Sequence, residues 1–80
     1  MRKHYAIQPG RQQQVVLQRE AEIICLSGRL HISMPPHMLG DSLVTGQRTV
    51  GTGQGFRAYA AGRVTLDTDQ ATRYTIKMAA

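Results

Sequence analysis

The segment from Ile23 to Met34 constrains the fold most, because two short apolar runs meet there at Ser27-Gly28. A two-residue turn with glycine between apolar runs is typical of a β-hairpin. We expect Gly28 to take a positive φ angle in this turn. Paired in this register, four side chains share one face and form the expected core, namely Ile23, Cys25, Leu30 and Ile32. Ile24 and Leu26 then lie on the opposite face and leave apolar surface to be covered.

Residues 1–80 are enough for one small β domain, whose core is marginal at this size. The only cysteine, Cys25, cannot form an internal disulfide, and no Cys/His set has the spacing of a zinc site. We interpret Cys25 as a reduced, packed thiol of a cytoplasmic protein. No apolar segment approaches the roughly 18 residues of a membrane helix, so a soluble protein is expected.

The N-terminal part of the chain predicts two strands. His4 to Gln8 alternates weakly and ends at Pro9-Gly10, which indicates a short edge strand. Arg11 to Glu22 is ambiguous, because its composition also suits a helix. The β-branched run Val15-Val16-Leu17 after a Pro-Gly turn favours a strand, and the helix stays open as the alternative.

The middle of the chain is punctuated by prolines and glycines. Pro35-Pro36 should end the first ladder, because proline cannot donate a backbone hydrogen bond. We expect a loop through Gly40-Asp41, followed by two short strands at Leu43-Val44 and Arg48 to Val50 with Gly46 between them. A flexible, glycine-rich connection should follow.

A second hairpin is predicted from Phe56 to Leu66 around Ala60-Ala61-Gly62. Its register puts Phe56, Ala58, Val64 and Leu66 on the inner face. The last alternating stretch, Arg73 to Met78, places Tyr74, Ile76 and Met78 inward and Arg73, Thr75 and Lys77 outward. Both predicted hairpins carry Gly-Arg before alternating apolar residues, which indicates either ordinary turn chemistry or a pseudo-symmetric pair.

Many short strands separated by turn residues predict an all-β fold, either a small antiparallel barrel or a sandwich. At Gly28-Arg29-Leu30-His31-Ile32-Ser33, followed by Gly40 to Gly46, the chain resembles a family of small, uncharacterised, cupin-like bacterial domains. That family has Trp at the position of His31 and Thr at the position of Ser33. The likeness spans roughly Ile7 to Leu66. It implies a short, open, antiparallel barrel of the cupin type and no reaction.

Metal-binding cupins use a His-x-His pair with a Glu and a distant His, whereas His31 and His37 are separated by a Pro-Pro break. A site made by His31, His37 and Asp41 would need all three to converge. We expect instead that His31 faces solvent and His37 lies in a loop, so no metal and no other cofactor is predicted. The glycines of Gly51 to Gly55 precede a strand and not a helix, which disfavours a phosphate loop.

The net charge of +5 and pI near 10.2 permit contact with nucleic acid or with an acidic partner. The registers above place one set of residues on an outward face, with Thr65 and Thr75 between them: Arg57, Tyr59, Arg63, Arg73 and Lys77. Such a face is a candidate nucleic-acid-binding surface, although nucleic-acid-binding sheets usually carry several stacking rings. A solvated sheet face is the competing interpretation.

No carboxylate pair or activated nucleophile is evident, so we predict a protein that is not an enzyme. The leading hypothesis is a small binding or interaction module that forms a homodimer by covering an exposed edge or apolar face. The alternatives are a nucleic-acid-binding domain that uses the basic face, and a domain that binds a small ligand in a barrel mouth.

Overall fold

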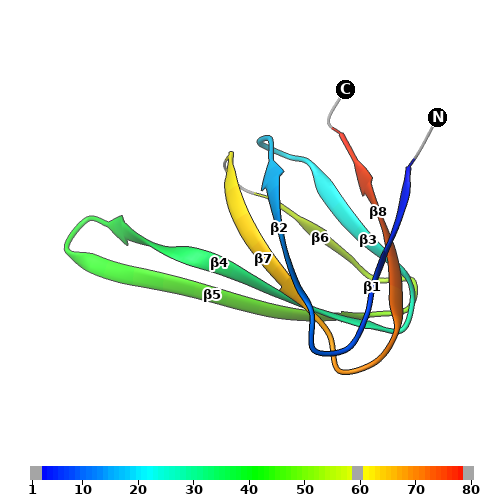
Figure 1. Cartoon of the computed structure of the whole chain (residues 1–80). Helices are drawn as coiled ribbons and strands as arrows, with labels where there is room; N and C mark the ends of the chain where they lie inside the picture. Colours follow the sequence, from blue (N-terminus) through cyan, green and yellow to red (C-terminus); the bar gives the residue numbers. More distant parts are fainter. Residues whose placement is uncertain (1–2, 59–60, 79–80) are drawn as a thin grey trace.

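The described part of the chain consists of strands joined by short connections (Figure 1). The computed structural model describes residues 3–58 and 61–78, and for residues 35–39 and 42–45 it describes the backbone. The strands, in order, are β1 (His4–Ile7), β2 (Gln12–Leu17), β3 (Glu22–Ser27), β4 (Arg29–Leu39), β5 (Ser42–Gly51), β6 (Gly55–Arg57), β7 (Gly62–Asp67) and β8 (Thr72–Lys77). Within these residues there is no helix that is long and apolar enough to cross a membrane.

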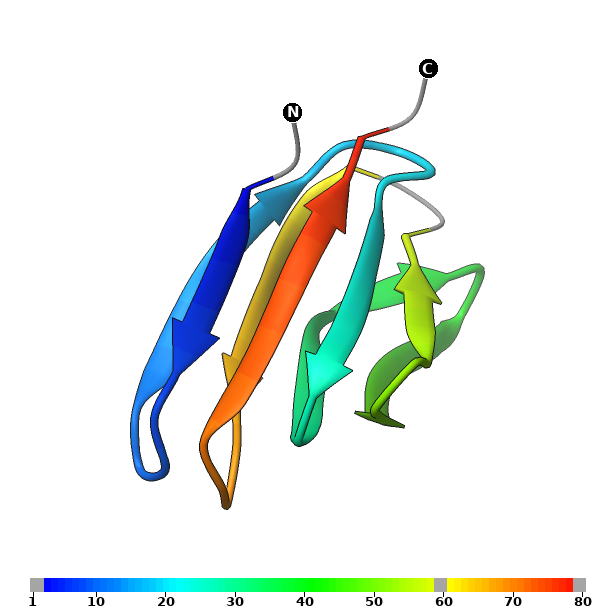
Figure 2. The ribbon, with the colours of Figure 1, turned by 90° about the vertical axis from the view of Figure 1, so that its right-hand side faces the viewer.

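The strands form two four-stranded antiparallel sheets that face each other (Figures 1 and 2). Sheet A has the order β1-β8-β3-β6, which Figure 2 shows from its outer side, and sheet B has the order β2-β7-β4-β5. The predicted all-β class is therefore confirmed. The described strands make two separate sheets and not one closed barrel.

The predicted core face is confirmed. Ile23, Cys25, Leu30 and Ile32 are completely buried, and the first two come from sheet A while the others come from sheet B. The remaining buried apolar side chains complete the layer between the sheets: Ile7, Leu17, Ala21, Val50, Phe56, Ala58, Val64, Leu66 and Tyr74. Burial of this layer is the main stabilising contribution to so small a domain.

The hairpin predicted across Ser27-Gly28 is wrong. β3 pairs with β8 and β6, whereas β4 pairs with β5 and β7, so the chain crosses from sheet A to sheet B at Gly28. Period-two alternation decides which side chains face inward whatever the partner strand is, and for this reason the predicted core face survives. The positive φ predicted for Gly28 is also found, at 96°.

The Gly28 corner lies directly against the connection between β7 and β8. A Cβ atom on Gly28 would come within 2.5 Å of Thr72 Oγ1 and 2.7 Å of the Ala71 carbonyl oxygen. The buried Thr72 hydroxyl accepts a hydrogen bond from the Arg29 amide at 3.1 Å, and Thr68 Oγ1 donates to the Arg29 carbonyl at 2.6 Å. These contacts fix the crossing, and they require glycine at its apex.

The second predicted hairpin is also wrong, because β6 belongs to sheet A and β7 belongs to sheet B. Its predicted inner face is nevertheless buried, with Phe56, Ala58 and Val64 at 5–6% exposure and Leu66 at 0%. Ala60 lies outside the described residues. Phe56 and Leu66, predicted on the inner face of one hairpin, instead come from opposite sheets and lie in the same core.

The predictions for the terminal strands are largely confirmed. β1 is an edge strand of sheet A, and β2 shows that the strand interpretation of residues 11–22 was right and the helix alternative wrong. Tyr74 is buried and Ile76 packs against the core, but Met78, predicted inward, follows the end of β8 and is half exposed. Thr75, predicted outward, is completely buried, and its hydroxyl donates to the Lys3 carbonyl at 2.8 Å.

The sequence predicted that Pro35-Pro36 would end the ladder, and this prediction is wrong. β4 continues through the prolines to Leu39, and its register with β5 shifts between Met34 and His37. Proline is tolerated at such a bulge, and β4 pairs with β7 only over residues 31–33, so no second ladder needs the missing donors. The two short strands expected around Gly46 form the single strand β5, which a two-residue turn at Gly40-Asp41 joins to β4.

One end of the sandwich is closed by a polar bridge between the sheets. Gln13 on β2 accepts a hydrogen bond from the Tyr74 hydroxyl of β8 at 2.5 Å and donates to the Ala6 carbonyl of β1 at 3.2 Å. The rings of Tyr5 and Tyr74 stack with 5.3 Å between their centroids. Burial, and secondarily the neighbouring Tyr5, raises the pKa of Tyr74, which keeps its hydroxyl protonated as the donor.

The close approach at Gly28 gives a testable prediction. Gly28→Ala should lower the free energy of unfolding by about 1–3 kcal/mol more than Gly10→Ala, because both variants bear the cost of a positive φ and Gly28→Ala adds the cost of overpacking. Gly10 is the matched control, because its φ is also positive, at 79°, and nothing lies within 4 Å of its added Cβ. Urea denaturation of both variants measures the difference, and equal losses would contradict the packing at the corner.

Candidate functional site

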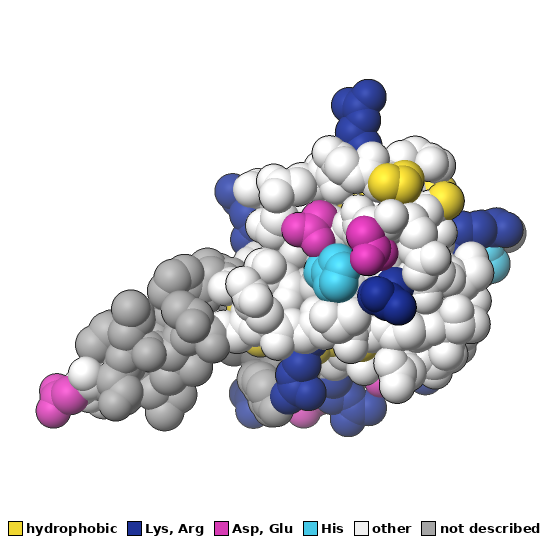
Figure 3. Space-filling model, turned by 90° about the horizontal axis from the view of Figure 1, so that it is seen from below, with side chains coloured by type: hydrophobic (Ala, Val, Ile, Leu, Met, Phe, Trp, Pro, Cys, Tyr) yellow, Lys and Arg dark blue, Asp and Glu magenta, His cyan; other side chains and the backbone are white. Residues whose placement is uncertain are grey.

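The structure does not bring the predicted nucleic-acid-binding residues onto one surface. Arg57, Arg73 and Lys77 lie on sheet A, whereas Arg63 lies on β7 of sheet B. Tyr59 lies outside the described residues. On sheet A, Glu22 is paired with both Arg57 and Lys77, so a carboxylate stands between two of the cations. A different surface, the lower end of the molecule, also carries mixed charge, with acidic and histidine side chains beside a basic one (Figure 3).

The described aromatic rings do not supply a stacking surface for this set. Tyr5 and Tyr74 are register partners on the inner side of sheet A, where Tyr74 and Phe56 are buried and Tyr5, on the edge strand, stacks on Tyr74. A solvated, mixed-charge face therefore describes the outer side of sheet A better than a nucleic-acid platform does. Nucleic-acid binding stays a prediction that rests on cations alone.

The three residues considered for a metal are spread along one hairpin. His31 pairs with Thr49 and His37 pairs with Val44 on the far side of the bulge, while Asp41 lies in the turn at the hairpin tip. The separation of six positions between His31 and His37 corresponds to about 20 Å of extended strand. His31 is half-buried, and its Nδ1 lies 3.0 Å from the Thr49 hydroxyl oxygen. Across the described residues, no group of three His, Cys, Asp or Glu could hold a metal.

The glycine-rich connection from Gly51 to Gly55 is a tight turn held to β3 and not the flexible link that the sequence predicted. The Gly53 amide donates to the Cys25 carbonyl at 2.8 Å, and the Cys25 amide donates to the Gln54 carbonyl at 2.9 Å. The Thr52 hydroxyl lies 3.2 Å from the Gly28 amide. No helix begins here, so the turn lacks the helix N-terminus of a phosphate loop.

The β4–β5 hairpin projects from the sandwich (Figure 1). Beyond Ser33 of β4, the two strands pair only with each other among the described strands, and β5 is an edge of sheet B along its ten residues. A two-stranded ribbon is marginally stable in water by itself. Residues 30–47 contain a single Asp, Glu, Lys or Arg, which is Asp41 in the turn. The hairpin therefore offers a long edge with little charge.

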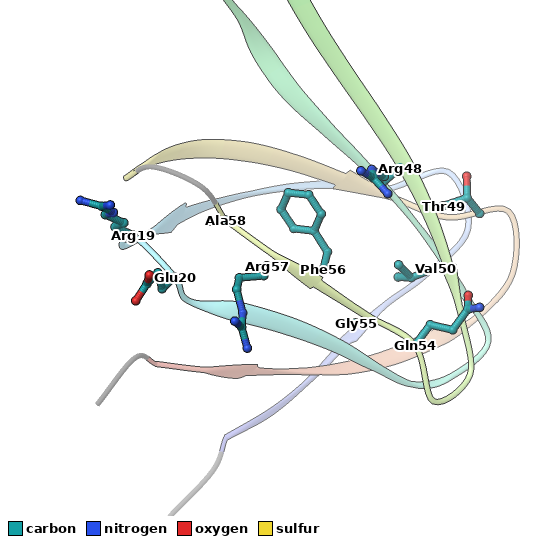
Figure 4. Close-up of a pocket in the computed structure, with 10 residues that line it drawn as sticks. All are labelled: Arg19, Glu20, Arg48, Thr49, Val50, Gln54, Gly55, Phe56, Arg57 and Ala58. Atoms are coloured by element: carbon teal, nitrogen blue, oxygen red, sulfur yellow. The ribbon is translucent and has the colours of Figure 1, made fainter.

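A groove of about 800 Å³ opens between β5 and β6, at the end of the sandwich opposite the Gln13 bridge (Figure 4). Its walls come from the β2–β3 turn, from β5, and from the segment that includes β6. The lining residues are Arg19, Glu20, Arg48, Thr49, Val50, Gln54, Gly55, Phe56, Arg57 and Ala58. This volume is in the range of sites for small organic ligands.

Arg48 is the cation that the strand register aims into the groove. It is paired with the fully buried Ile32, and paired residues of antiparallel strands share a face, so Arg48 projects from the inner face of sheet B. Val50, two residues along β5, lies on the same face and is 6% exposed. Arg48 itself is exposed, because β5 extends past the facing strands. The site thus combines a guanidinium with an apolar floor.

Backbone groups of β6 also point into the groove. The Ala58 amide donates to the Ala21 carbonyl and the Cys25 amide donates to the Gln54 carbonyl, so these residues and Phe56 between them pair with β3. Hydrogen-bonding direction alternates along a strand, and Gly55 and Arg57 therefore direct their amides away from β3. β6 is the edge of sheet A, so these amides face the groove. The Arg57 side chain instead projects from the opposite side of β6 to Phe56 (Figure 4).

The sequence analysis missed Arg48, Gln13 and Thr72 as organising residues. The sequence did contain a signal for Arg48. It lies two positions before Val50 in the strand, so the two side chains share a face. Gln13 and Thr72 act through contacts with residues far along the chain, and no local pattern marks them. Phe56 was predicted inward, but its place beside an open end depends on the crossing between the sheets.

No protein-family model and no curated protein matches this chain. A crystal structure of a protein of unknown function, DUF1255, from Acinetobacter sp. ADP1, is similar with a TM-score of 0.70. The match covers 98% of this chain and 69% of that chain, at 16% sequence identity. Identity this low shows a shared fold and nothing about activity.

The burial of Cys25 gives a testable prediction. Burial raises the pKa of this thiol, against a smaller lowering by the Ser27 backbone, so the reactive thiolate is scarce at pH 8. Folded protein should react with Ellman's reagent at least about a hundredfold more slowly than protein in guanidinium, because reaction requires opening of the core. Cys25→Ser gives the background, and equal rates with and without denaturant would contradict the packed thiol.

Proposed function

We propose that this chain is a non-enzymatic interaction module that forms a homodimer by pairing the β5 edges of two copies. The observation that carries the proposal is the ten-residue edge strand β5, half of which belongs to a ribbon without further partners among the described strands. Such an edge presents unpaired amide and carbonyl groups that bind another strand. Pairing would extend sheet B and support the projecting hairpin.

A second copy suits this edge better than an unrelated partner of high charge. β5 carries one charged residue, Arg48, whose side chain leaves from the face of the sheet, so two chains of net charge +5 would meet along an edge with little like charge. A two-fold axis between identical edges gives antiparallel pairing, and one such contact closes the assembly. A core of this size also gains stability from association.

The absence of enzymatic activity is part of the same proposal. It is supported by the buried state of Cys25 and by the exposure of Asp41 and Asp69, the second of which pairs with Arg29 at the surface. We further propose that the fold is cupin-like. Two facing antiparallel sheets and the Gly28-to-Ser33 and Gly40-to-Gly46 resemblance support that assignment.

The other edge strand of sheet B is β2, which could pair between two copies in place of β5. The strand register provides matched positions on the two edges with which to test which one pairs. Gln47 and Gln14 are the two ends of one row across the sheet, and Thr49 and Gln12 are the two ends of the next row. All four side chains are exposed. The double variants Gln47→Lys/Thr49→Lys and Gln12→Lys/Gln14→Lys therefore add the same charge to the same face at opposite edges.

We expect a dimer in sedimentation equilibrium at tens of micromolar. Lysines on β5 should weaken it at least about tenfold, because like charges meet across the paired edges and each opposed pair costs up to about 1 kcal/mol. The β2 variant should dissociate like the wild type. A monomeric wild type at 100 µM, or a dimer that only the β2 variant disrupts, would refute pairing through β5.

A further inference from the structure

We infer that the groove between β5 and β6 binds a small organic anion, in which a carboxylate or phosphate group is carried on a flat apolar group. The inference is independent of the proposed dimer. Pairing through β5 uses the strand edge, whereas Arg48 leaves from the inner face of sheet B, so both can occur in one molecule.

The charge of the groove favours an anion. Apart from Arg57, whose side chain leaves from the other side of β6, two arginines and one glutamate line it. The ion pair found within residues 3–58 and 61–78 joins Arg29 to Asp69, at 3.6 Å, and so does not involve Arg48. Arginine presents a planar fork of donors that matches the two oxygens of a carboxylate or phosphate. The Arg48 guanidinium is therefore available to an anion from solution.

The groove also supplies neutral donors and an apolar surface for the rest of the ligand. The edge-facing amides of Gly55 and Arg57 can donate to a second oxygen, as edge amides of a sheet do in anion sites. Gln54 uses its Oε1 to accept from the Gly51 amide at 2.7 Å, so its side-chain amide remains a donor. Phe56 and Val50 form the floor against which a flat group would pack.

An inward arginine at an open edge also discourages uncontrolled strand pairing, and this role needs no ligand. The two explanations differ in what they require of the surroundings. Edge protection needs only a charge, whereas anion binding needs a charge beside donors and an apolar floor in a volume of ligand size. Arg48 has all three in the groove.

The test is a titration of the uniformly ¹⁵N-labelled chain, followed by amide chemical shifts, with four probes. Benzoate and phenyl phosphate carry the anion on a ring, benzyl alcohol keeps the ring without charge, and inorganic phosphate keeps the charge without a ring. We expect benzoate or phenyl phosphate to shift the Gly55 and Arg57 amides and to bind at least about tenfold more tightly than either single-feature probe. The tighter of the two identifies the head group.

Arg48→Gln should weaken the better probe at least about tenfold, the loss of one charge-assisted, bidentate contact. Arg73→Gln is the matched control, because Arg73 is exposed on β8 of sheet A and does not line the groove, and it should change the affinity less than about threefold. No shifts at 10 mM of either aromatic anion, shifts centred on Arg63 or Arg73, or equal losses in the two variants would overturn the inference. None of these results bears on the oligomeric state.

Discussion

The close approach of Gly28 to Thr72 is the contact on which the sandwich depends. At this corner the chain leaves sheet A and enters sheet B, and the Thr68 and Thr72 hydroxyls hydrogen-bond to the backbone of Arg29, the first residue of β4. A Cβ would meet the Thr72 hydroxyl and the Ala71 carbonyl. The identity of residue 28 thus decides whether the two sheets can face each other at their native spacing.

The sequence was sufficient to predict the strands and their inner faces, because both follow from local alternation. Ile23, Cys25, Leu30 and Ile32 were assigned to the core from a hairpin that does not exist, and they are buried because alternation does not depend on the partner strand. Pairing was not predictable at the corners. A glycine of positive φ serves equally well in a two-residue hairpin turn and in a crossing between sheets, and the choice depends on Thr72, more than forty residues away.

The candidate sites likewise depend on which strands pair, and local sequence does not determine this. The predicted basic residues do not share one face. The prediction put Arg57 and Arg63 on one hairpin, whereas they occupy different sheets. The groove could not be predicted, because it exists only where β5 and β6, from opposite sheets, leave an end of the sandwich open. The other end is sealed by Gln13 and Tyr74. One small domain therefore has one side closed by the Gln13–Tyr74 contact and an open side that carries the groove and the β5 edge.

The strand order also determines how this chain acquires its structure. β8 lies between β1 and β3, and β7 lies between β2 and β4, so each sheet places a late strand between two early ones. Each sheet is completed late, because among the described strands β1 pairs with β8 and β2 pairs with β7. Topologies dominated by such distant pairings fold slowly. During synthesis, β1 and β2 therefore stay unpaired until β8 and β7 have been made. The glutamines of β2 keep that unpaired segment polar.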